Sequence, residues 1–335
     1  MPKAFVLLTA LPPTKGHAHL IEFAHALVGV DETTVILSTQ PDEPFIHERF
    51  MTINSLSWTV HLNQFVQQVP EGPDDNAFWI MWAKELVDLG FKPGDYIVAS
   101  ELYGKTLAEW VNGVFIPYDL ERRIYNCTAT AVRERPYVNF HHIHPSFQPV
   151  LRQTITFFGA ESCGKTTSSK HFARDYDAWW LPEWARPYLE ALDDPTVTDE
   201  HMYNIWQGQL AMQKQAQKLQ DKPFIVQDTD LFSTIGYWNM YGGMPEGIID
   251  DAVANKSDLY IVMSSDIPFE VDRLRYGGHE RESNDEYWLS MCEEFGLNYV
   301  YITDENFIMR DARSRLAAMD LFDKVASKLS YERVK

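Results

Sequence analysis

The chain has 335 residues, of which 45% are hydrophobic and 23% are charged, a composition typical of globular proteins. A formal net charge of −19 disfavours non-specific binding to nucleic acid, because an acidic surface repels the phosphate backbone. The three widely spaced cysteines indicate neither a disulfide framework nor a zinc site, and no apolar run has the length of a membrane span. We therefore expect a cytoplasmic protein that binds neither nucleic acid nor membrane, and the sequence leaves open whether it is a homo-oligomer.

Predicted strands and helices alternate in the first half of the chain. Short apolar or β-branched runs predict strands at residues 4–8, 34–38, 96–99 and 114–116. Apolar residues at helical spacing predict helices at residues 17–28, 48–65 and 78–89. Strands separated by helices are typical of a doubly wound parallel sheet, so we predict an α/β domain of this Rossmann-like kind over residues 1–148.

The alternation weakens over residues 139–149, which hold two prolines and three histidines. We interpret this segment as a solvated linker rather than a metal site, because no cysteine or carboxylate accompanies the histidines. The pattern then restarts, with strands expected at residues 154–158, 179–181, 224–227, 259–263 and 298–302. Helices are expected from Lys165 and over residues 201–219 and 309–329. A second doubly wound parallel domain is therefore predicted over residues 149–335.

Residues 159–166 match the P-loop pattern G-x-x-x-x-G-K-[ST]. They follow a predicted strand and open a predicted helix, which is the context that the motif requires. Its glycines let backbone N–H groups point at phosphate oxygens, and the helix N-terminus adds positive potential. We expect Lys165 to reach the outer phosphates of ATP and the Thr166 hydroxyl to bind Mg²⁺. The phosphate-binding residues predicted here are Gly159, Ser162, Gly164, Lys165, Thr166 and Thr167.

Three carboxylates are candidates for the chemistry of this second domain. Asp228 and Asp230 follow a predicted strand, and ligands of open α/β sheets bind at the carboxyl ends of strands. Asp228 is expected to hold Mg²⁺ or a substrate hydroxyl, and Asp230 to bind substrate. Glu183 follows another predicted strand and is a candidate general base. The pattern does not decide between Glu183 and Asp228 as the base, and each carboxylate could instead be a solvated strand end.

A glycine-bearing stretch near residue 277 carries three arginines. It has the composition of a lid that brings guanidinium groups to a transferring phosphoryl group, where such arginines raise rates by about 10³-fold or more. We predict a catalytic role for Arg275 and phosphate contacts for Arg273 and Arg281. The alternative is a charged, solvated loop.

The turn after the first strand carries Thr14, Gly16 and His17, at the place where a doubly wound domain binds phosphate. An imidazole there can donate to the α- and β-phosphates of ATP during attack on the α-phosphorus. Alone, the turn could be only a helix start. Hydroxyl and guanidinium donors suited to triphosphate oxygens recur after the last strand of this domain, at Thr128, Thr130 and Arg133.

These two segments together resemble the nucleotidyltransferase superfamily that carries an [HT]-x-G-H signature. The order of motifs along nearly the whole chain is similar to the NadR family, which joins a nicotinamide mononucleotide adenylyltransferase to a ribosylnicotinamide kinase. The segments that carry the first half of the resemblance are residues 12–17, residues 100–104, Asp119 with Arg122 and Arg123, and residues 128–136. Those that carry the second half are residues 157–167, 183–186, 208–209, 228–230 and 266–269, with Asp272 and Arg275.

The resemblance implies a nucleotidyltransferase domain followed by a P-loop kinase domain, with ATP as co-substrate, Mg²⁺ and no tightly bound organic cofactor. His17 and Thr14 would stabilise the ATP phosphates in adenylyl transfer to nicotinamide mononucleotide, with the distal hydroxyls and Arg133 as a clamp. The second half would phosphorylate nicotinamide riboside, with Arg186 among its substrate-binding residues. Its product would be the substrate of the first half.

The chain departs from the family at three places. Thr14 stands where the H-x-G-H signature has its first histidine, a variant that the superfamily tolerates. Leu8 stands where the family has glycine, and a side chain there would reduce the space for adenosine. Some members begin with a helix-turn-helix domain, and a first strand at Ala4 leads us to expect none here. Two other functions remain open: the same folds acting on another nucleoside and phosphate ester, and a non-catalytic sensor of NAD or ATP.

Overall fold

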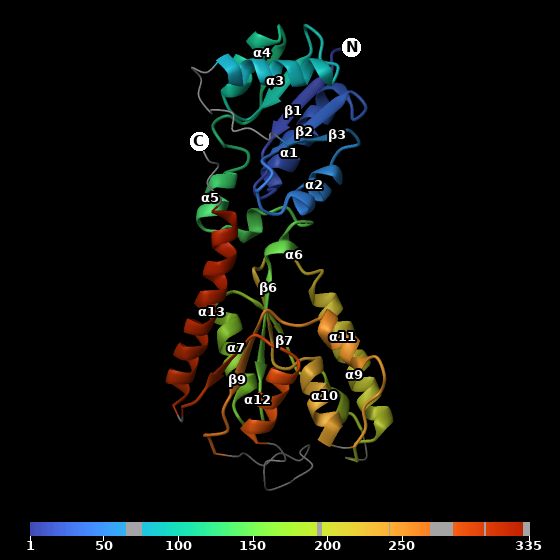
Figure 1. The fold of residues 1–335 in the computed structure, drawn as a ribbon, viewed down its shortest axis with the longest axis vertical. Helices are drawn as coiled ribbons and strands as arrows, with labels where there is room; N and C mark the ends of the chain where they lie inside the picture. The colour runs from blue at the N-terminus through green and yellow to red at the C-terminus, as the bar shows by residue number, and fades with distance from the viewer. Residues whose placement is uncertain (65–75, 193–195, 241, 269–283, 305, 331–335) are drawn as a thin grey trace. The chain divides into compact units, whose positions relative to one another are not determined.

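The computed structural model describes residues 1–64, 76–192, 196–240, 242–268, 284–304 and 306–330 (Figure 1). The chain divides into two compact units. The first consists of Met1–Val150 with the chain from Val325 onward, and the second of Leu151–Lys324. Within the described residues, no helix combines the length and apolar character that crossing a membrane requires.

The first unit contains a five-stranded parallel sheet with the order β3-β2-β1-β4-β5. Its strands are β1 (Ala4–Leu8), β2 (Thr33–Thr39), β3 (Val60–Gln64), β4 (Tyr96–Ala99) and β5 (Val114–Pro117). Its helices are α1 (Lys15–Val28), α2 (Ile46–Asn54), α3 (Asn76–Asp88), α4 (Tyr103–Trp110), α5 (Ala129–Glu134), the 3-10 helix η1 (Phe140–His142) and α6 (Gln148–Leu151), which ends one residue into the second unit. The chain reverses direction across the sheet at β1, so the turn after β1 lies at the topological switch point.

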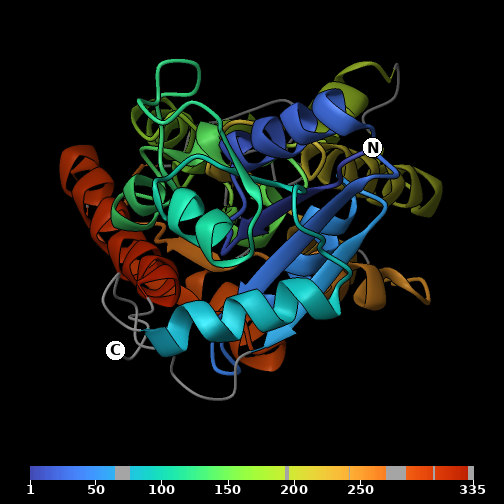
Figure 2. The same cartoon turned by 90° about the horizontal axis from the view of Figure 1, so that it is seen from above.

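Both faces of this sheet are buried. The alternate residues Val6 and Leu8 of β1 belong to a core cluster with Leu20 and Ile21 of α1. Phe5 belongs to a second cluster, to which α3 contributes its two tryptophans. Figure 2 shows α1 and α3 on opposite faces of the sheet. Burial on both faces explains why β1 is a continuous apolar run rather than an alternating one.

Two expectations for this half were wrong. The helix predicted over residues 48–65 ends at Asn54, and β3 follows at Val60–Gln64, because pairing with β2 overrides the helical spacing of the apolar residues. Residues 139–149 are not a solvated linker. Ile143 and Phe147 are fully buried, and the backbone of Ile143 bridges to that of Thr14. This segment therefore supports the turn after β1.

The second unit repeats the doubly wound arrangement with the strand order β10-β9-β6-β8-β7, again all parallel. Its strands are β6 (Gln153–Phe158), β7 (Trp179–Leu181), β8 (Phe224–Gln227), β9 (Leu259–Met263) and β10 (Tyr299–Ile302). Its helices are α7 (Lys165–Asp175), α8 (Ala185–Glu190), α9 (Asp199–Ala216), α10 (Leu231–Met240), α11 (Ile248–Ala254), α12 (Asp285–Glu294) and α13 (Phe307–Leu329), whose residues from Val325 onward belong to the first unit. The predicted fold class, two doubly wound parallel α/β sheets, is confirmed.

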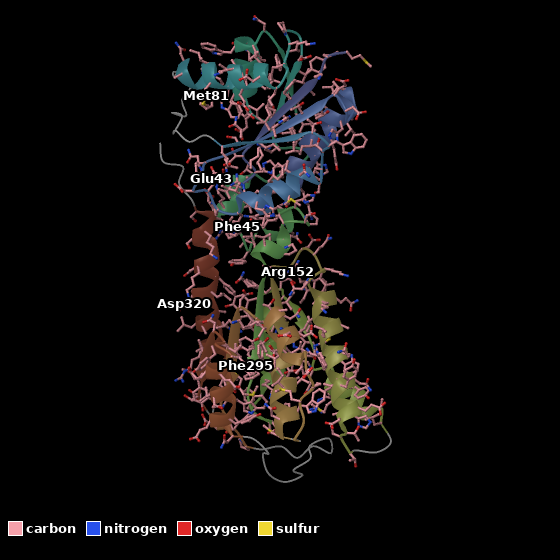
Figure 3. The ribbon with its side chains drawn as sticks, turned by 45° about the vertical axis from the view of Figure 1, so that its right-hand side comes forward. Glu43, Phe45, Met81, Arg152, Phe295 and Asp320 are labelled. Atoms are coloured by element: carbon pink, nitrogen blue, oxygen red, sulfur yellow. The ribbon has the colours of Figure 1, made fainter. Side chains whose placement is uncertain are left out.

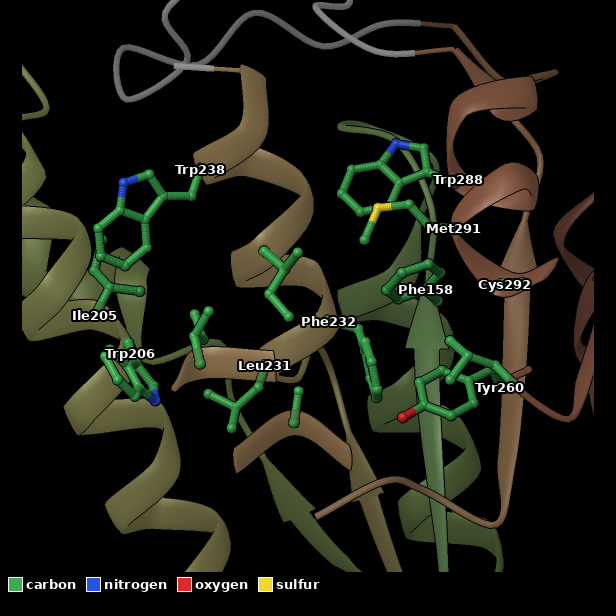
Figure 4. Close-up of a cluster of buried hydrophobic side chains, with 14 of the residues drawn as sticks. Phe158, Ile205, Trp206, Leu231, Phe232, Trp238, Tyr260, Trp288, Met291 and Cys292 are labelled. Atoms are coloured by element: carbon green, nitrogen blue, oxygen red, sulfur yellow. The ribbon is translucent and has the colours of Figure 1, made fainter. Parts of the chain in front are cut away.

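An aromatic core fixes the central strand of this unit. Phe158, the last residue of β6, packs edge-on against Trp288 of α12 with ring centroids 5.0 Å apart (Figure 4). Tyr260 of β9 and residues of α9 and α10 complete the cluster. At the other end of β6, the buried Arg152 donates hydrogen bonds to the carbonyls of Gln217 and Lys222 (Figure 3). Both anchors hold the strand from which the P-loop extends.

Candidate nucleotide-binding sites

The loop between β6 and α7 has a backbone that only certain residues adopt without strain. Gly159 and Gly164 have φ angles of +126° and +87°, and Ser162 has +52°. A Cβ atom on Gly159 would lie 2.7 Å from the carbonyl oxygen of Met263. Glycine is therefore required at the start of this loop, both for its conformation and for the close approach of β9. The loop curls as a P-loop does and leads into the N-terminus of α7.

Lys165 folds back over this loop. Its Nζ donates hydrogen bonds to the carbonyls of Gly159 at 2.8 Å and Ala160 at 2.6 Å. Thr167, also predicted to bind phosphate, is exposed in the first turn of α7. The loop, its lysine and the helix N-terminus are thus assembled at one place.

Thr166 and Asp228, 62 residues apart, meet at this place. The Thr166 hydroxyl donates a 2.7 Å hydrogen bond to Oδ2 of Asp228. The contact exists because β6 and β8 are adjacent and parallel, so their carboxyl ends lie side by side. Burial raises the pKa of Asp228, against the opposing effects of the Thr166 hydrogen bond and the charges of Lys165 and Lys170.

The other oxygen of Asp228, Oδ1, is buried and makes no hydrogen bond within the described part of the chain. Mg²⁺ prefers hard oxygen ligands, and a buried carboxylate oxygen without a hydrogen bond, beside a hydroxyl, is a ligand of this kind. Among the described residues, no three His, Cys, Asp or Glu side chains are grouped so that they could hold a metal ion. Magnesium typically binds one or two carboxylates together with substrate phosphates, so this donor set suits it.

Asp230 lies in a different environment. Its Oδ1 accepts hydrogen bonds from the backbone N–H groups of Phe232 and Ser233, and its Oδ2 accepts one from the Tyr260 hydroxyl at 2.7 Å. Its side chain is fully buried, which raises its pKa to about 6. These contacts favour a structural role at the junction of β8 and α10 over the substrate contact expected from the sequence.

A buried glutamine, Gln209 of α9, connects the two acidic strand ends. Its Oε1 accepts the N–H of Trp184, and its Nε2 donates to the carbonyl of Thr229. Glu183, which precedes Trp184, is thereby held near the strand end that carries Asp228. Gln209 belongs to the segment 208–209 that carries part of the family resemblance, and in the sequence it is a polar residue on the apolar stripe of a predicted helix. Neither signal indicates its contacts with Trp184 and Thr229.

Four arginines of the second unit were expected to bind substrate or phosphate, and the structure describes one of them. Arg186 forms a 3.9 Å ion pair with Glu190 on α8, and its charge also lowers the pKa of Asp228. Arg273, Arg275 and Arg281 lie outside the described residues.

In the first unit, Thr14 and His17 form a reciprocal cap at the N-terminus of α1. Nδ1 of His17 accepts the Thr14 N–H at 3.0 Å and lies 2.9 Å from the Thr14 hydroxyl. Removal of the ring from water lowers the pKa of His17 to about 4, with further contributions from the positive charges of Arg122, Arg49 and Arg133. The ring is therefore neutral near pH 7.

Gly16 is required for packing. A Cβ atom there would lie 2.7 Å from the ring of Tyr125. That ring is itself fixed, since the Tyr125 hydroxyl donates to the carbonyl of His142 at 3.0 Å.

The distal segment predicted from the sequence joins the same turn. Arg133 donates to the carbonyl of Leu11, 122 residues away, at 2.8 Å, and to the Thr130 hydroxyl at 2.9 Å. Thr128 caps α5 by accepting the N–H of Ala131. Leu8 lies in the core cluster under α1, where its side chain is 5% exposed.

Arg49 of α2 is a residue of this site that the sequence reasoning missed. It is fully buried and donates to the carbonyls of Thr9 and Ala10 and, at 2.7 Å, to the carboxylate of Glu43. Through these hydrogen bonds, it holds the backbone of the first two residues after β1. The signal was an arginine among the apolar positions of a predicted helix.

Comparison with known proteins bears on both units. Residues 154–310 match a family model described as an AAA domain. The whole chain is similar to a crystal structure of NadR protein in complex with NAD and AMP-PNP, with 20% identity, 100% of this chain and 98% of that chain covered, and a TM-score of 0.62. A crystal structure of NadR protein in complex with NR has 21% identity, covers 96% of each chain and has the same TM-score of 0.62. The chain therefore has the fold of the NadR protein over both of its units, with a P-loop domain in the second.

Proposed function

We propose that the chain is a bifunctional enzyme of NAD synthesis. The second unit phosphorylates nicotinamide riboside with ATP, and the first transfers the adenylyl group of ATP to the resulting mononucleotide, giving NAD and pyrophosphate. The observation that carries this proposal is that in each unit the turn after the central strand leads into a helix N-terminus. Thr14 and His17 lie at one of these turns, and Lys165 and Thr166 at the other. The fold shared with proteins crystallised with NAD, AMP-PNP and NR supports the choice of substrates.

In the kinase reaction, the 5′-hydroxyl oxygen of the riboside attacks the γ-phosphorus of ATP, and the bond to the bridging oxygen breaks to release ADP. The hydroxyl proton passes to a carboxylate, for which Asp228 and Glu183 are the candidates. Lys165 would exchange the carbonyls of Gly159 and Ala160 for phosphate oxygens. The Thr166 hydroxyl and the Asp228 carboxylate would hold Mg²⁺, which neutralises charge on the phosphates when it is bound.

In the adenylyl transfer, a phosphate oxygen of the mononucleotide attacks the α-phosphorus of ATP, and pyrophosphate leaves. The attacking group is already anionic, so the site needs no strong base. His17 supplies a neutral N–H donor, while Arg133 and Arg122 supply positive charge near it. The Thr14 hydroxyl, beside Nδ1, would position the imidazole rather than contact phosphate.

Product analysis tests both reactions at once. The full chain is incubated with nicotinamide riboside and Mg-ATP, and nucleotides are separated by chromatography. The mononucleotide should appear first and NAD second. Lys165→Ala should stop formation of the mononucleotide but still convert supplied mononucleotide to NAD, whereas His17→Ala should accumulate the mononucleotide. Absence of both products with the wild type would refute the proposal.

A panel of other substrates separates the alternatives. Nucleosides and mononucleotides are compared by thermal shift, since a ligand at about 100 times its Kd stabilises the folded state by roughly 2.7 kcal/mol. If the protein phosphorylates another nucleoside and not nicotinamide riboside, the fold is retained but the proposed substrates are wrong. Binding of NAD or ATP without any turnover would indicate a sensor.

A further inference from the structure

A guanidinium group is buried against the P-loop of the second unit. Arg310 of α13 is fully buried, and its Nη1 donates 3.0 Å hydrogen bonds to the carbonyls of Cys163, in the loop, and Ser264, after β9. Its Nη2 donates to the Ser264 hydroxyl at 2.9 Å, and its Nε donates to the carbonyl of Asp304. The carboxylate of Asp266 lies 4.0 Å from Nη2. One side chain thus connects the P-loop to the segments that follow β9 and β10.

The hydrogen bond to Cys163 determines how one peptide of the loop is oriented. A trans peptide is planar, and its C=O and N–H groups point in opposite directions. Because the Cys163 carbonyl points at Arg310, the N–H of Gly164 points to the opposite side of the loop. In a P-loop, N–H groups directed to that side are the ones that meet phosphate oxygens.

The same guanidinium adds positive charge where it is poorly screened. Arginine stays protonated in proteins, and a charge removed from water acts more strongly on its surroundings than an exposed one. Three of its hydrogen bonds go to neutral carbonyls, which satisfy donors without cancelling the charge. The Asp266 carboxylate is partly exposed and lies 4.0 Å from Nη2, so it offsets the charge only in part. The side of the loop facing a phosphate therefore gains both an oriented donor and positive potential.

We propose that Arg310 is a positioning residue for ATP in the second unit: it holds the Cys163–Gly164 peptide and so sets the donors that receive the phosphates. This inference rests on the proposed phosphoryl transfer. Arg310 acts on ATP through the peptide that it holds and does not need to touch it, which fits a fully buried side chain.

Arg313 provides a matched control on the same helix. It donates to the carbonyl of Thr303 and lies 3.6 Å from the carboxylate of Asp304, so it also fastens α13 to the turn after β10. Its contacts among the described residues do not reach the P-loop. A role that consisted only of anchoring α13 would be shared by both arginines.

The test compares Arg310→Met, Arg310→Lys and Arg313→Met in the full chain. Kinase kcat and KM are measured separately for ATP and for nicotinamide riboside, and adenylyl transfer to supplied mononucleotide checks that the first unit is intact. Arg310→Met should lower kcat/KM for ATP by about 10²-fold, the usual effect of losing one preorganised donor. Arg310→Lys should recover part of this loss, because it keeps the charge but lacks the planar fork. Arg313→Met should stay within about threefold of wild type.

Binding of Mg-ADP separates this inference from the proposed function. Mg-ADP binding to the second unit is identified as the part of the total binding that Lys165→Ala removes. In Arg310→Met, the affinity of this part should fall by about the same factor as kcat/KM for ATP. A wild type that binds Mg-ADP there but does not phosphorylate the riboside would refute the proposed reaction alone. Unchanged kcat/KM for ATP in both Arg310 variants, or an equal loss in Arg313→Met, would overturn the positioning role. If Arg310→Met does not fold, the same comparison is made with Arg310→Lys, for which a kcat/KM for ATP equal to wild type overturns it.

Discussion

Nδ1 of His17 accepts the backbone N–H of Thr14 at 3.0 Å. Since Nδ1 is an acceptor, the proton of the neutral ring is assigned to Nε2. A pKa lowered to about 4 by burial keeps the ring in this state over the physiological range. The first unit therefore presents a fixed N–H donor, and the positive charge of its site comes from arginines rather than from an imidazolium.

This relationship predicts a pH dependence of stability. An unfolded histidine takes up a proton below about pH 6.5, whereas the folded ring of His17 resists protonation until about pH 4. The unfolded state thus binds more protons between these values, and the wild type loses stability as the pH falls through this window. His17→Asn lacks this loss. Relative to the variant, the wild type should lose up to about 2 kcal/mol between pH 7 and pH 4.5 in denaturant unfolding. A constant difference between the two proteins would show that His17 is not held neutral.

Arg133 should be essential to adenylyl transfer and not to the kinase. Arg133→Met removes the hydrogen bonds to the Leu11 carbonyl and the Thr130 hydroxyl, together with a charge near His17. We expect a loss of about 10²-fold or more in adenylyl transfer, measured with supplied mononucleotide. Arg133→Lys should recover little, because lysine lacks the planar fork that reaches both partners. Arg135→Met removes an exposed arginine of the same segment and serves as the control. Equal losses from both positions would count against a specific clamp.

Asp228 should show opposite effects on activity and on stability. Burial raises the pKa of Asp228 above its usual range, so its charged form is disfavoured in the folded state. The folded state then binds more protons than the unfolded state above the usual pKa, and stability is lost as the pH rises through the folded pKa. Asp228→Asn should therefore abolish kinase activity while leaving the nucleotide-free protein as stable as wild type, or more stable, at pH 7 by thermal unfolding. A clear drop in stability would mean that the Thr166 hydrogen bond outweighs the cost of burying the charge.

The parts of these sites that lie within one turn of chain could be predicted from the sequence. The P-loop pattern at residues 159–166 specifies the loop, the strand before it and the helix that it opens, and the Thr14–His17 cap is local to the start of α1. The sheets followed from apolar runs separated by helices, because a strand buried on both faces is apolar throughout. Local patterns sufficed wherever the partners are close in sequence.

Some contacts between distant residues were expected, such as those of Arg133 with the turn after β1 and of Thr166 with Asp228, but others could not be predicted. The sequence places Arg49 among apolar helix positions but does not indicate that its partners are Thr9 and Ala10. It likewise does not indicate that Asp230 meets Tyr260, since these contacts join residues 30 or more positions apart. β3 was missed for the same reason: its apolar residues fit a helix until β2 is present to pair with them. Long-range packing selects among the local structures that the sequence allows.

Gly208 of α9 provides the last test, because its packing controls the position of a candidate base. A Cβ atom at Gly208 would overlap the ring of Trp184, which stacks on Tyr188 with centroids 5.0 Å apart. Gly208→Ala should therefore destabilise the protein by about 1–3 kcal/mol, although alanine in a helix interior normally stabilises by up to about 1 kcal/mol. The same shift should move Glu183 and raise KM for the nucleoside more than KM for ATP.

The exposed neighbour Gln207 gives the control, since Gln207→Ala tests a similar change on α9 without a new atom against Trp184. Combining Gly208→Ala with Trp184→Phe should restore part of the stability, because the smaller ring leaves room for the methyl group. Such coupling between contacting residues appears as a non-additive free energy of unfolding in a double-mutant cycle. If Gly208→Ala is as stable and as active as Gln207→Ala, then Trp184 is free to move, and Glu183 is not positioned through this contact.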